Sequence, residues 1–122
     1  MGSIAFRLTE ASRELLLKHF SPKFEVVRCD HVTHIFGVDA TAELPPAPES
    51  AVVVGYASDA GLECLVVEIN GSSKRPDGLT YHITHSRGAG RESVESNAVI
   101  KEHGWHRLDS FIPIETEVCY SE

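Results

Sequence analysis

The segment 79–86 reads Leu-Thr-Tyr-His-Ile-Thr-His-Ser, and an earlier segment, 29–36, reads Cys-Asp-His-Val-Thr-His-Ile-Phe. Both contain the four letters His-aliphatic-Thr-His, and both are typical of β-strands. Side chains along a strand point alternately to its two faces. We therefore expect His82, Thr84 and Ser86 to share one face of the later strand.

The earlier segment predicts the same arrangement. His31 and Thr33 are expected on one face, and the mostly apolar opposite face is expected to carry Val32, His34 and Phe36. If the two strands lie close with their His-Thr faces shared, two imidazoles and two hydroxyls converge on one small space. That is a symmetric acid–base site, because histidine is the side chain whose unperturbed pKa lies nearest neutrality.

The chain as a whole predicts one α+β domain spanning residues 1–122, with a mixed or antiparallel sheet and one or two helices. Thr9 is suited to cap a helix that begins at Glu10 and ends before Ser21-Pro22. The two His-Thr motifs are expected on central strands of the sheet. Further strands are expected at 4–8, 51–56, 62–69 and 111–120, and the first motif is expected within a long, bent strand at 24–38.

Two segments are expected to be polar surface loops. Residues 39–50 are rich in Ala, Pro and Glu, and their prolines forbid regular structure. This segment is not expected to be a domain linker, because neither side of it is large enough to fold alone. Residues 70–78 lead into the later His-Thr strand, and Lys74 and Arg75 are expected at the tip of that loop.

Composition and charge limit the classes to which the protein can belong. The chain has 122 residues, of which 42% are hydrophobic and 24% charged, which is ordinary for a soluble domain with one core. Its net charge of −7 argues against general binding of duplex DNA, which needs a basic surface. Three cysteines without a CxxC spacing suit free thiols in a reducing compartment. No signal peptide or membrane span is visible, so we expect a cytoplasmic protein that does not bind membranes.

Two histidines on facing strands suit displacement at phosphorus in a cyclic phosphodiester. One imidazole takes a proton from water, and the other gives a proton to the departing ribose oxygen. The hydroxyls of Thr33 and Thr84 lie on the same faces and can donate to the non-bridging oxygens as charge builds there. No metal is needed, because the leaving oxygen is protonated rather than coordinated.

With these motifs the sequence resembles the 2H phosphoesterases, a family named for two His-x-Thr/Ser motifs. The motifs stand at 31–34 and 82–85, and the first is followed by Gly37. The opening strand and helix, the Val-rich hairpin and the later Ser96-Asn97 are similar to a compact, RNA-repair-related branch of this family. The resemblance covers nearly the whole chain, although the strictly matching residues are few.

The resemblance implies hydrolysis of a cyclic phosphodiester without metal or cofactor. The typical substrate is a 2′,3′-cyclic phosphate on a nucleotide or an RNA end. It implies that His31 and His82 are the catalytic acid–base pair, and that Thr33 and Thr84 bind the phosphate. Which histidine is the acid depends on which ribose oxygen leaves.

The segment 87–97, which follows the second motif, is rich in Gly and Ser and locally basic. Its position makes it a candidate substrate loop, in which Arg87 and Arg91 could meet a phosphate. By the resemblance, Ser96 and Asn97 line the pocket. By their residue types alone, they equally suit the cap of the next element.

Three features depart from larger members of the family. The interval of 51 residues between His31 and His82 is short, so lobes that clamp RNA are expected to be missing. His34 and His85 fill the variable fourth position of each motif and are expected to be half-buried on the back face. The acidic balance favours a mononucleotide, a short oligonucleotide or another small cyclic phosphate over long RNA.

A His-rich transition-metal site is the rival interpretation, because the pattern HxxH occurs at 31–34, 82–85 and 103–106. Residues three apart on a strand point to opposite faces, so neither strand motif can chelate without a bend. His103 and His106 are expected at the surface or in a loop. A second alternative is a module that binds a nucleotide or phosphate in the same pocket without turning it over.

Overall fold

A break at Cys29 divides the expected strand 24–38 into two strands that belong to different sheets. In the computed structural model, which describes residues 1–122, Cys29 has a positive φ of 52°, and strand β2 (Val26–Val27) ends before it. Strand β3 (His31–Val38) begins after it and carries the first His-Thr motif. The chain therefore changes sheet immediately before the first candidate site residue.

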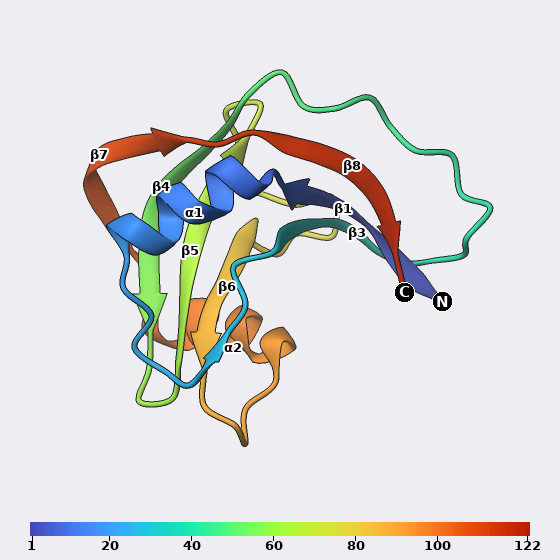
Figure 1. Ribbon diagram of the computed structural model, residues 1–122. Coiled ribbons are helices and arrows are strands. Elements are labelled where there is room, and N and C mark those ends of the chain that lie inside the picture. The colour runs from blue at the N-terminus through green and yellow to red at the C-terminus, as the bar shows by residue number, and fades with distance from the viewer.

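Two antiparallel sheets and two α-helices make up the domain, which has the expected α+β class. The other elements are β1 (Gly2–Leu8), α1 (Glu10–His19), β4 (Ala51–Ser58), β5 (Leu62–Ile69), β6 (His82–Arg87), the 3-10 helix η1 (Ser93–Glu95), α2 (Ser96–His103), β7 (His106–Pro113) and β8 (Thr116–Ser121). The smaller sheet has the strand order β3-β1-β8, and the larger has the order β2-β6-β5-β4-β7 (Figure 1).

The expectation of one sheet with both motifs on central strands is wrong. β6 is an inner strand of the larger sheet, but β3 lies at the edge of the smaller one. The expected strand 111–120 is also two strands, because β7 ends at Pro113 and β8 begins at Thr116 in the other sheet. Proline lacks the N–H that a continuing ladder needs. Figure 1 shows this part of the chain, in red, passing across the top from one sheet to the other.

Two local features agree with the sequence. The Thr9 hydroxyl accepts a hydrogen bond from the Ser12 N–H at 3.3 Å, and Glu10 places a negative charge in the first turn of α1. The helix ends at His19, before the predicted stop. The segment 39–50 forms neither helix nor strand, and Figure 1 shows it arching outward between β3 and β4.

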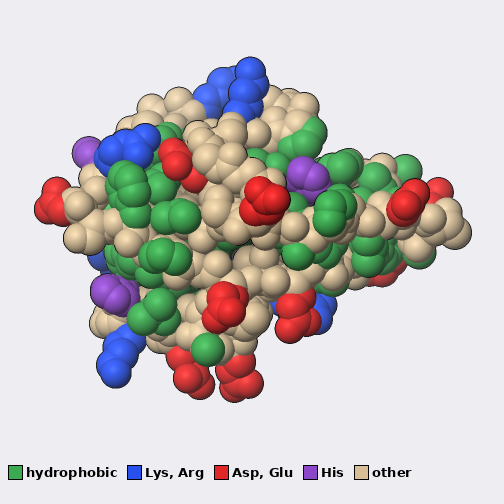
Figure 2. Space-filling model, turned by 90° about the horizontal axis from the view of Figure 1, so that it is seen from above, with side chains coloured by type: hydrophobic (Ala, Val, Ile, Leu, Met, Phe, Trp, Pro, Cys, Tyr) green, Lys and Arg blue, Asp and Glu red, His purple; other side chains and the backbone are tan.

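The surface carries many acidic groups, and the helices are short. On the face shown in Figure 2, acidic side chains are spread widely, while Lys and Arg form smaller separate groups. That distribution is consistent with the net charge of −7. No helix has the length and apolar character needed to cross a bilayer.

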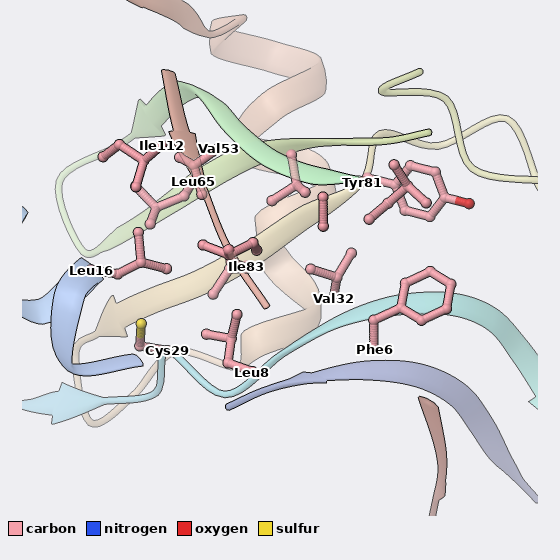
Figure 3. Packing of buried hydrophobic residues seen from close by; sticks show 14 residues of the cluster. Phe6, Leu8, Leu16, Cys29, Val32, Val53, Leu65, Tyr81, Ile83 and Ile112 are labelled. Carbon is pink, nitrogen blue, oxygen red and sulfur yellow. The ribbon is translucent and has the colours of Figure 1, made fainter. Parts of the chain in front are cut away.

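A hydrophobic core fills the space between the two sheets and α1 (Figure 3). Val32 and Ile83, the aliphatic residues inside the two His-x-Thr motifs, are both fully buried in it. Figure 3 shows Ile83 near the middle of the cluster, between Val32 and Leu16 of α1. Because side chains alternate along a strand, the His and Thr that flank each aliphatic residue face away from this core. The core therefore orients both His-Thr pairs.

The larger sheet is covered on its opposite face by α2. Val99 and Ile100 of α2 pack there with apolar residues of β4 and β5 in a second buried cluster. This is the face of β6 that carries His82 and Thr84, because Thr84 is hydrogen-bonded to η1 and α2. η1 and α2 therefore form one wall beside the later His-Thr pair.

Candidate active site

One cleft, with a volume of about 410 Å³, is lined by both His-Thr pairs. His31 and Thr33 come from β3, and His82 and Thr84 come from β6. The other walls come from the loop before β6, from η1 and α2, and from the ends of β1 and β8. The four side chains that the sequence predicts to converge are thus brought to one place.

A β-bulge follows the Thr of the first motif. The residues of β1 that pair with Thr33 and Ile35 are consecutive, so His34 is an extra residue in β3. An extra residue reverses the alternation of side chains beyond it. Phe36 therefore lies on the cleft side, and the expectation that it faces the opposite side is wrong.

β6 has a bulge at the equivalent position. Consecutive residues of β5 pair with Thr84 and Ser86, which leaves His85 as the extra residue. Ser86 consequently turns to the other face, where its hydroxyl donates a hydrogen bond to the buried carboxylate of Glu63. The sequence predicts Ser86 beside Thr84, and the bulge is the physical reason that this prediction is wrong.

The two extra histidines lie behind the cleft and are held by structural contacts. The half-buried His34 ring has its centroid 4.8 Å from that of Phe6, and its Nδ1 lies 2.7 Å from the hydroxyl of Tyr81. His85 is fully buried rather than half-buried, and its Nε2–H donates to the carbonyl oxygen of Phe20 at 2.6 Å. Neither ring lines the cleft, so its chemistry falls to the first histidine of each motif.

His82 is almost completely buried and has a fixed tautomer. Its Nδ1–H donates to the carbonyl oxygen of Thr80 at 2.8 Å, since a carbonyl oxygen can only accept. Burial lowers the pKa of His82 to about 4, and the charges of Arg75 and His31 act in the same direction. At neutral pH the ring is therefore uncharged, and Nε2 keeps a lone pair that can accept a proton.

His31 is half-buried at the edge of the smaller sheet, among charges of both signs. Burial lowers the pKa of its ring, and the neighbouring carboxylate of Asp30 opposes that shift. The guanidinium groups of Arg28 and Arg7 lower the pKa further. The net effect is a lowered pKa of His31, which the carboxylate of Asp30 offsets only in part.

The two threonine hydroxyls differ in their protein partners. Thr84 Oγ1 donates to the carbonyl oxygen of Ser93 at 3.2 Å and lies 2.8 Å from the Ser96 hydroxyl, which ties β6 to η1 and α2. Thr33 lines the cleft and makes no hydrogen bond to η1 or α2. Ser96 is fully buried behind Thr84 and supports the cleft instead of lining it, whereas Asn97 does line it.

The structure does not bring Arg87 and Arg91 into the cleft. Arg91 forms a bidentate pair with Asp59 at 2.9 and 2.8 Å, and its Nε donates to Glu95 at 2.6 Å. Arg87 Nη1 donates to the carbonyl oxygen of Arg91 at 2.6 Å. The expected loop 87–97 is also shorter than predicted, because it includes η1 and the start of α2. The contacts of these two arginines stabilise the conformation of the segment 87–97.

Arg75 is the cleft residue that sequence reasoning missed. Its side chain is only 5% exposed, and it pairs with Asp77 through Nε–Oδ1 at 3.2 Å and Nη2–Oδ2 at 2.6 Å. The Arg75 N–H also donates to the carbonyl oxygen of Leu79 at 2.8 Å, so the loop folds back on itself beside the site. The expectation of an exposed loop tip is wrong here. The Arg-x-Asp spacing signals the ion pair but carries no sign of its burial.

Residues that could hold a metal ion do not gather. No three side chains among His, Cys, Asp and Glu come together in a way that could bind one. His103 and His106 are exposed, as expected, in α2 and β7. Cys29 is fully buried in the core, and burial raises the pKa of its thiol to about 12. That thiol is therefore protonated at neutral pH.

The buried, neutral His82 predicts a loss of stability in mild acid. Its pKa is about 4 in the folded protein against an ordinary 6.5, so only the unfolded chain binds the proton between these values. The free energy of unfolding should fall as pH drops from 6.5 towards 4, by about 3 kcal/mol from this residue, with no contribution above that range. Urea unfolding of wild type and His82→Asn across this range measures the difference. Parallel pH curves for the two proteins would contradict the assignment.

No family model, curated protein or solved structure matches this chain. The resemblance to the 2H phosphoesterases therefore rests on the two His-x-Thr motifs and on the elements around them.

Proposed function

We propose that the protein hydrolyses a cyclic phosphodiester by metal-independent acid–base catalysis with two histidines. The substrate class is the 2′,3′-cyclic phosphate of a nucleotide or an RNA end, or a related cyclic nucleotide. The observation that carries the proposal is the single cleft lined by both His-Thr pairs, which come from strands of different sheets. Two histidines that served only to stabilise the sheets would not be expected to line the same cleft, together with both threonine hydroxyls.

In the proposed reaction His82 is the base and His31 is the acid. His82 Nε2 takes a proton from a water molecule as the water oxygen attacks phosphorus. The bond from phosphorus to one ribose oxygen breaks, and that oxygen takes a proton from His31. The product has gained one water molecule, and proton exchange with solvent restores both rings. The hydrogen bond from His82 Nδ1 to Thr80 supports the role of His82 as the base, and Asp30 is the neighbour that favours the protonated form of His31.

Negative charge that develops on the non-bridging oxygens has donors close to it. The Thr33 hydroxyl is available in the cleft, and the Thr84 hydroxyl can turn its hydrogen from the Ser93 carbonyl oxygen to the phosphate. Arg75 adds a guanidinium whose charge is partly offset by its ion pair with Asp77, which also lines the cleft. Asp77 occupies the Nε and Nη2 edge of that guanidinium, which leaves Nη1 for a ligand oxygen.

The rim of the cleft suits a nucleoside. Phe36, Leu79 and Val94 line it and are 74%, 40% and 66% exposed. Apolar and aromatic side chains around a polar centre fit a ligand that carries a flat base next to a charged group. The cleft therefore favours a nucleotide over an inorganic or purely aliphatic cyclic phosphate.

Hydrolysis of cyclic nucleotides in the presence of EDTA tests the proposal. The panel comprises 2′,3′-cyclic nucleotides, short RNAs that end in a cyclic phosphate, and cyclic dinucleotides. Mass spectrometry should show the gain of one water by at least one substrate, and the isomer formed identifies the ribose oxygen that leaves. The chelator should leave the rate unchanged, because the leaving oxygen is protonated by a side chain.

Two other outcomes would replace this proposal. Product that forms only after addition of zinc or manganese would identify a metal-dependent hydrolase. Binding of cyclic nucleotides without product under either condition would identify a nucleotide-binding module that uses the same cleft.

A further inference from the structure

A second hollow of about 450 Å³ shares part of its lining with the cleft. The residues that line both hollows are Arg28, Asp30, His31 and Ser121. The two hollows are therefore adjacent, and His31 borders both. The second hollow lies over the smaller sheet and the start of α1, and the proposed reaction makes no use of it.

Three arginines line the second hollow. Arg7 reaches it from β1, directly across the β1–β3 ladder from His31. Arg13 comes from α1, and Arg28 precedes β3. Directly paired residues have their side chains on the same face of a sheet, so Arg7 lies on the face of the acid–base pair. On the other side of β1, Arg7 is directly paired with Glu117 of β8, whose side chain lies on the same face although it does not line the hollow.

The two carboxylates that line the hollow are fewer than the three arginines. Asp30 contacts Arg28 at 3.1 Å and Arg13 at 3.8 Å, so one negative charge serves two positive ones. Arg7 forms no ion pair, and Glu10 is the one other acid in the lining. Three arginines against two carboxylates leave the lining of the second hollow with one excess positive charge, in a chain of net charge −7, and this suits an anionic group of a ligand.

We infer that the second hollow binds a phosphate group attached to the 5′ oxygen of the reacting nucleoside. This inference rests on the proposed function. In the ribose ring the base is attached at C1′, next to C2′, and the 5′ carbon is attached at C4′, next to C3′. The base and the 5′ carbon therefore lie at opposite ends of the C2′–C3′ bond that carries the cyclic phosphate. Phe36 and His31 lie towards opposite ends of β3, with Phe36 at the apolar rim and His31 at the second hollow. A base at Phe36 therefore directs the 5′ oxygen towards Arg7.

The inference narrows the substrate class. A 5′ phosphate is present in the linkage to a preceding nucleotide and in a nucleotide that ends in a free 5′ phosphate. The preferred substrate is then an oligonucleotide 3′ end or a 5′-phosphorylated nucleotide. A simple nucleoside 2′,3′-cyclic phosphate leaves the second hollow empty and should bind more weakly.

Equilibrium binding of product nucleotides tests the inference without turnover. Wild-type protein should bind cytidine 3′,5′-bisphosphate about tenfold more tightly than cytidine 3′-phosphate, since a charge-assisted contact is added. Arg7→Gln should remove that difference and weaken the binding of cytidine 3′-phosphate much less than that of the bisphosphate. Lys101→Gln, which removes an exposed charge from α2, is the matched control and should keep the full difference. Added salt should reduce the difference in wild type.

Equal affinity of wild type for the two ligands would overturn the inference, as would an equal loss for both in Arg7→Gln. If cyclic nucleotides are hydrolysed despite equal affinities, the proposed function stands without this second site. If the difference in affinity depends on Arg7 but no substrate is hydrolysed, the binding site stands and the proposed function fails.

A dinucleotide that ends in a 3′ phosphate distinguishes the two sources of the 5′ phosphate group, which are an oligonucleotide linkage and a free 5′ terminus. Affinity at least equal to that of the bisphosphate identifies an oligonucleotide linkage, and weaker binding identifies a terminal 5′ phosphate.

Discussion

Replacing His31 or His82 with Ala should lower kcat on a cyclic phosphodiester by about 10²–10⁴-fold, the usual contribution of a positioned acid or base. Both rings line the cleft, and neither belongs to the main core cluster. Because the two act in one step, the double variant should be little worse than either single variant. Initial rates on the best substrate of the EDTA panel measure the effect.

The control for these variants is His103→Ala. His103 is exposed on α2, away from the cleft, so its loss should leave the rate unchanged. His82→Gln should accompany His82→Ala, because His82 is buried and its removal leaves a cavity. Unfolding curves establish that each variant is folded at the assay temperature. Turnover near the wild-type rate in a folded His31 or His82 variant would exclude the proposed mechanism.

Thr33→Val should lower kcat by about 10²–10³-fold, the effect expected for removing one donor to an oxyanion. The substitution keeps the shape of the side chain and removes only the hydroxyl, which has no tie to η1 or α2. Thr33→Ser keeps the donor and should retain most of the activity. A similar rate for Thr33→Val and Thr33→Ser would show that this hydroxyl does not contact the reacting phosphate.

Thr84→Val should differ from Thr33→Val in one respect. It should lower kcat as well, but it also removes the hydrogen bonds that Thr84 makes to Ser93 and Ser96. We expect a loss of about 1 kcal/mol or more in the free energy of unfolding, which Thr33→Val should not show. Equal stabilities for the two variants, measured in urea, would contradict the proposed tie between β6 and the α2 wall.

The orientation of the His-Thr pair within each motif is predictable from sequence because it depends on local alternation, whereas the convergence of the two pairs depends on how the two sheets pack. Val32 and Ile83 are apolar and must be buried, so the residues on either side of each must face away from the core. The α1 cap at Thr9 is predictable for the same reason, since a cap is a contact within a few residues. Nothing in these two cases requires knowledge of distant partners.

The bulges at His34 and His85 could not be predicted in this way. The pattern of each motif is compatible with an unbroken strand, and the extra residue is visible only in the pairing with β1 or β5. Simple alternation of side chains therefore predicts the wrong face for Phe36 and for Ser86. The division into two sheets is not predictable for a related reason. Cys29 has a positive φ, which is uncommon for residues other than glycine, and a cysteine in the sequence does not indicate it.

Arg75 was missed because its burial is a tertiary effect. A charged residue in a polar, Gly-containing loop is normally solvated, and only the folding of that loop beside His82 brings the guanidinium into the cleft. The sequence offers Arg91 as a substrate contact, but its side chain does not line the cleft. Its partners Asp59 and Glu95 engage it instead, and Asp59 lies far away in the chain.

The most direct test of the central claim is hydrolysis in ¹⁸O-labelled water with EDTA present, on a short RNA that ends in a 2′,3′-cyclic phosphate. Wild-type protein should yield a single phosphomonoester isomer with one ¹⁸O atom on phosphorus, and the double variant His31→Ala/His82→Ala should yield none. Label incorporation that requires an added metal, or that persists at the wild-type rate in the double variant, would contradict the claim that two histidines in this cleft carry the reaction.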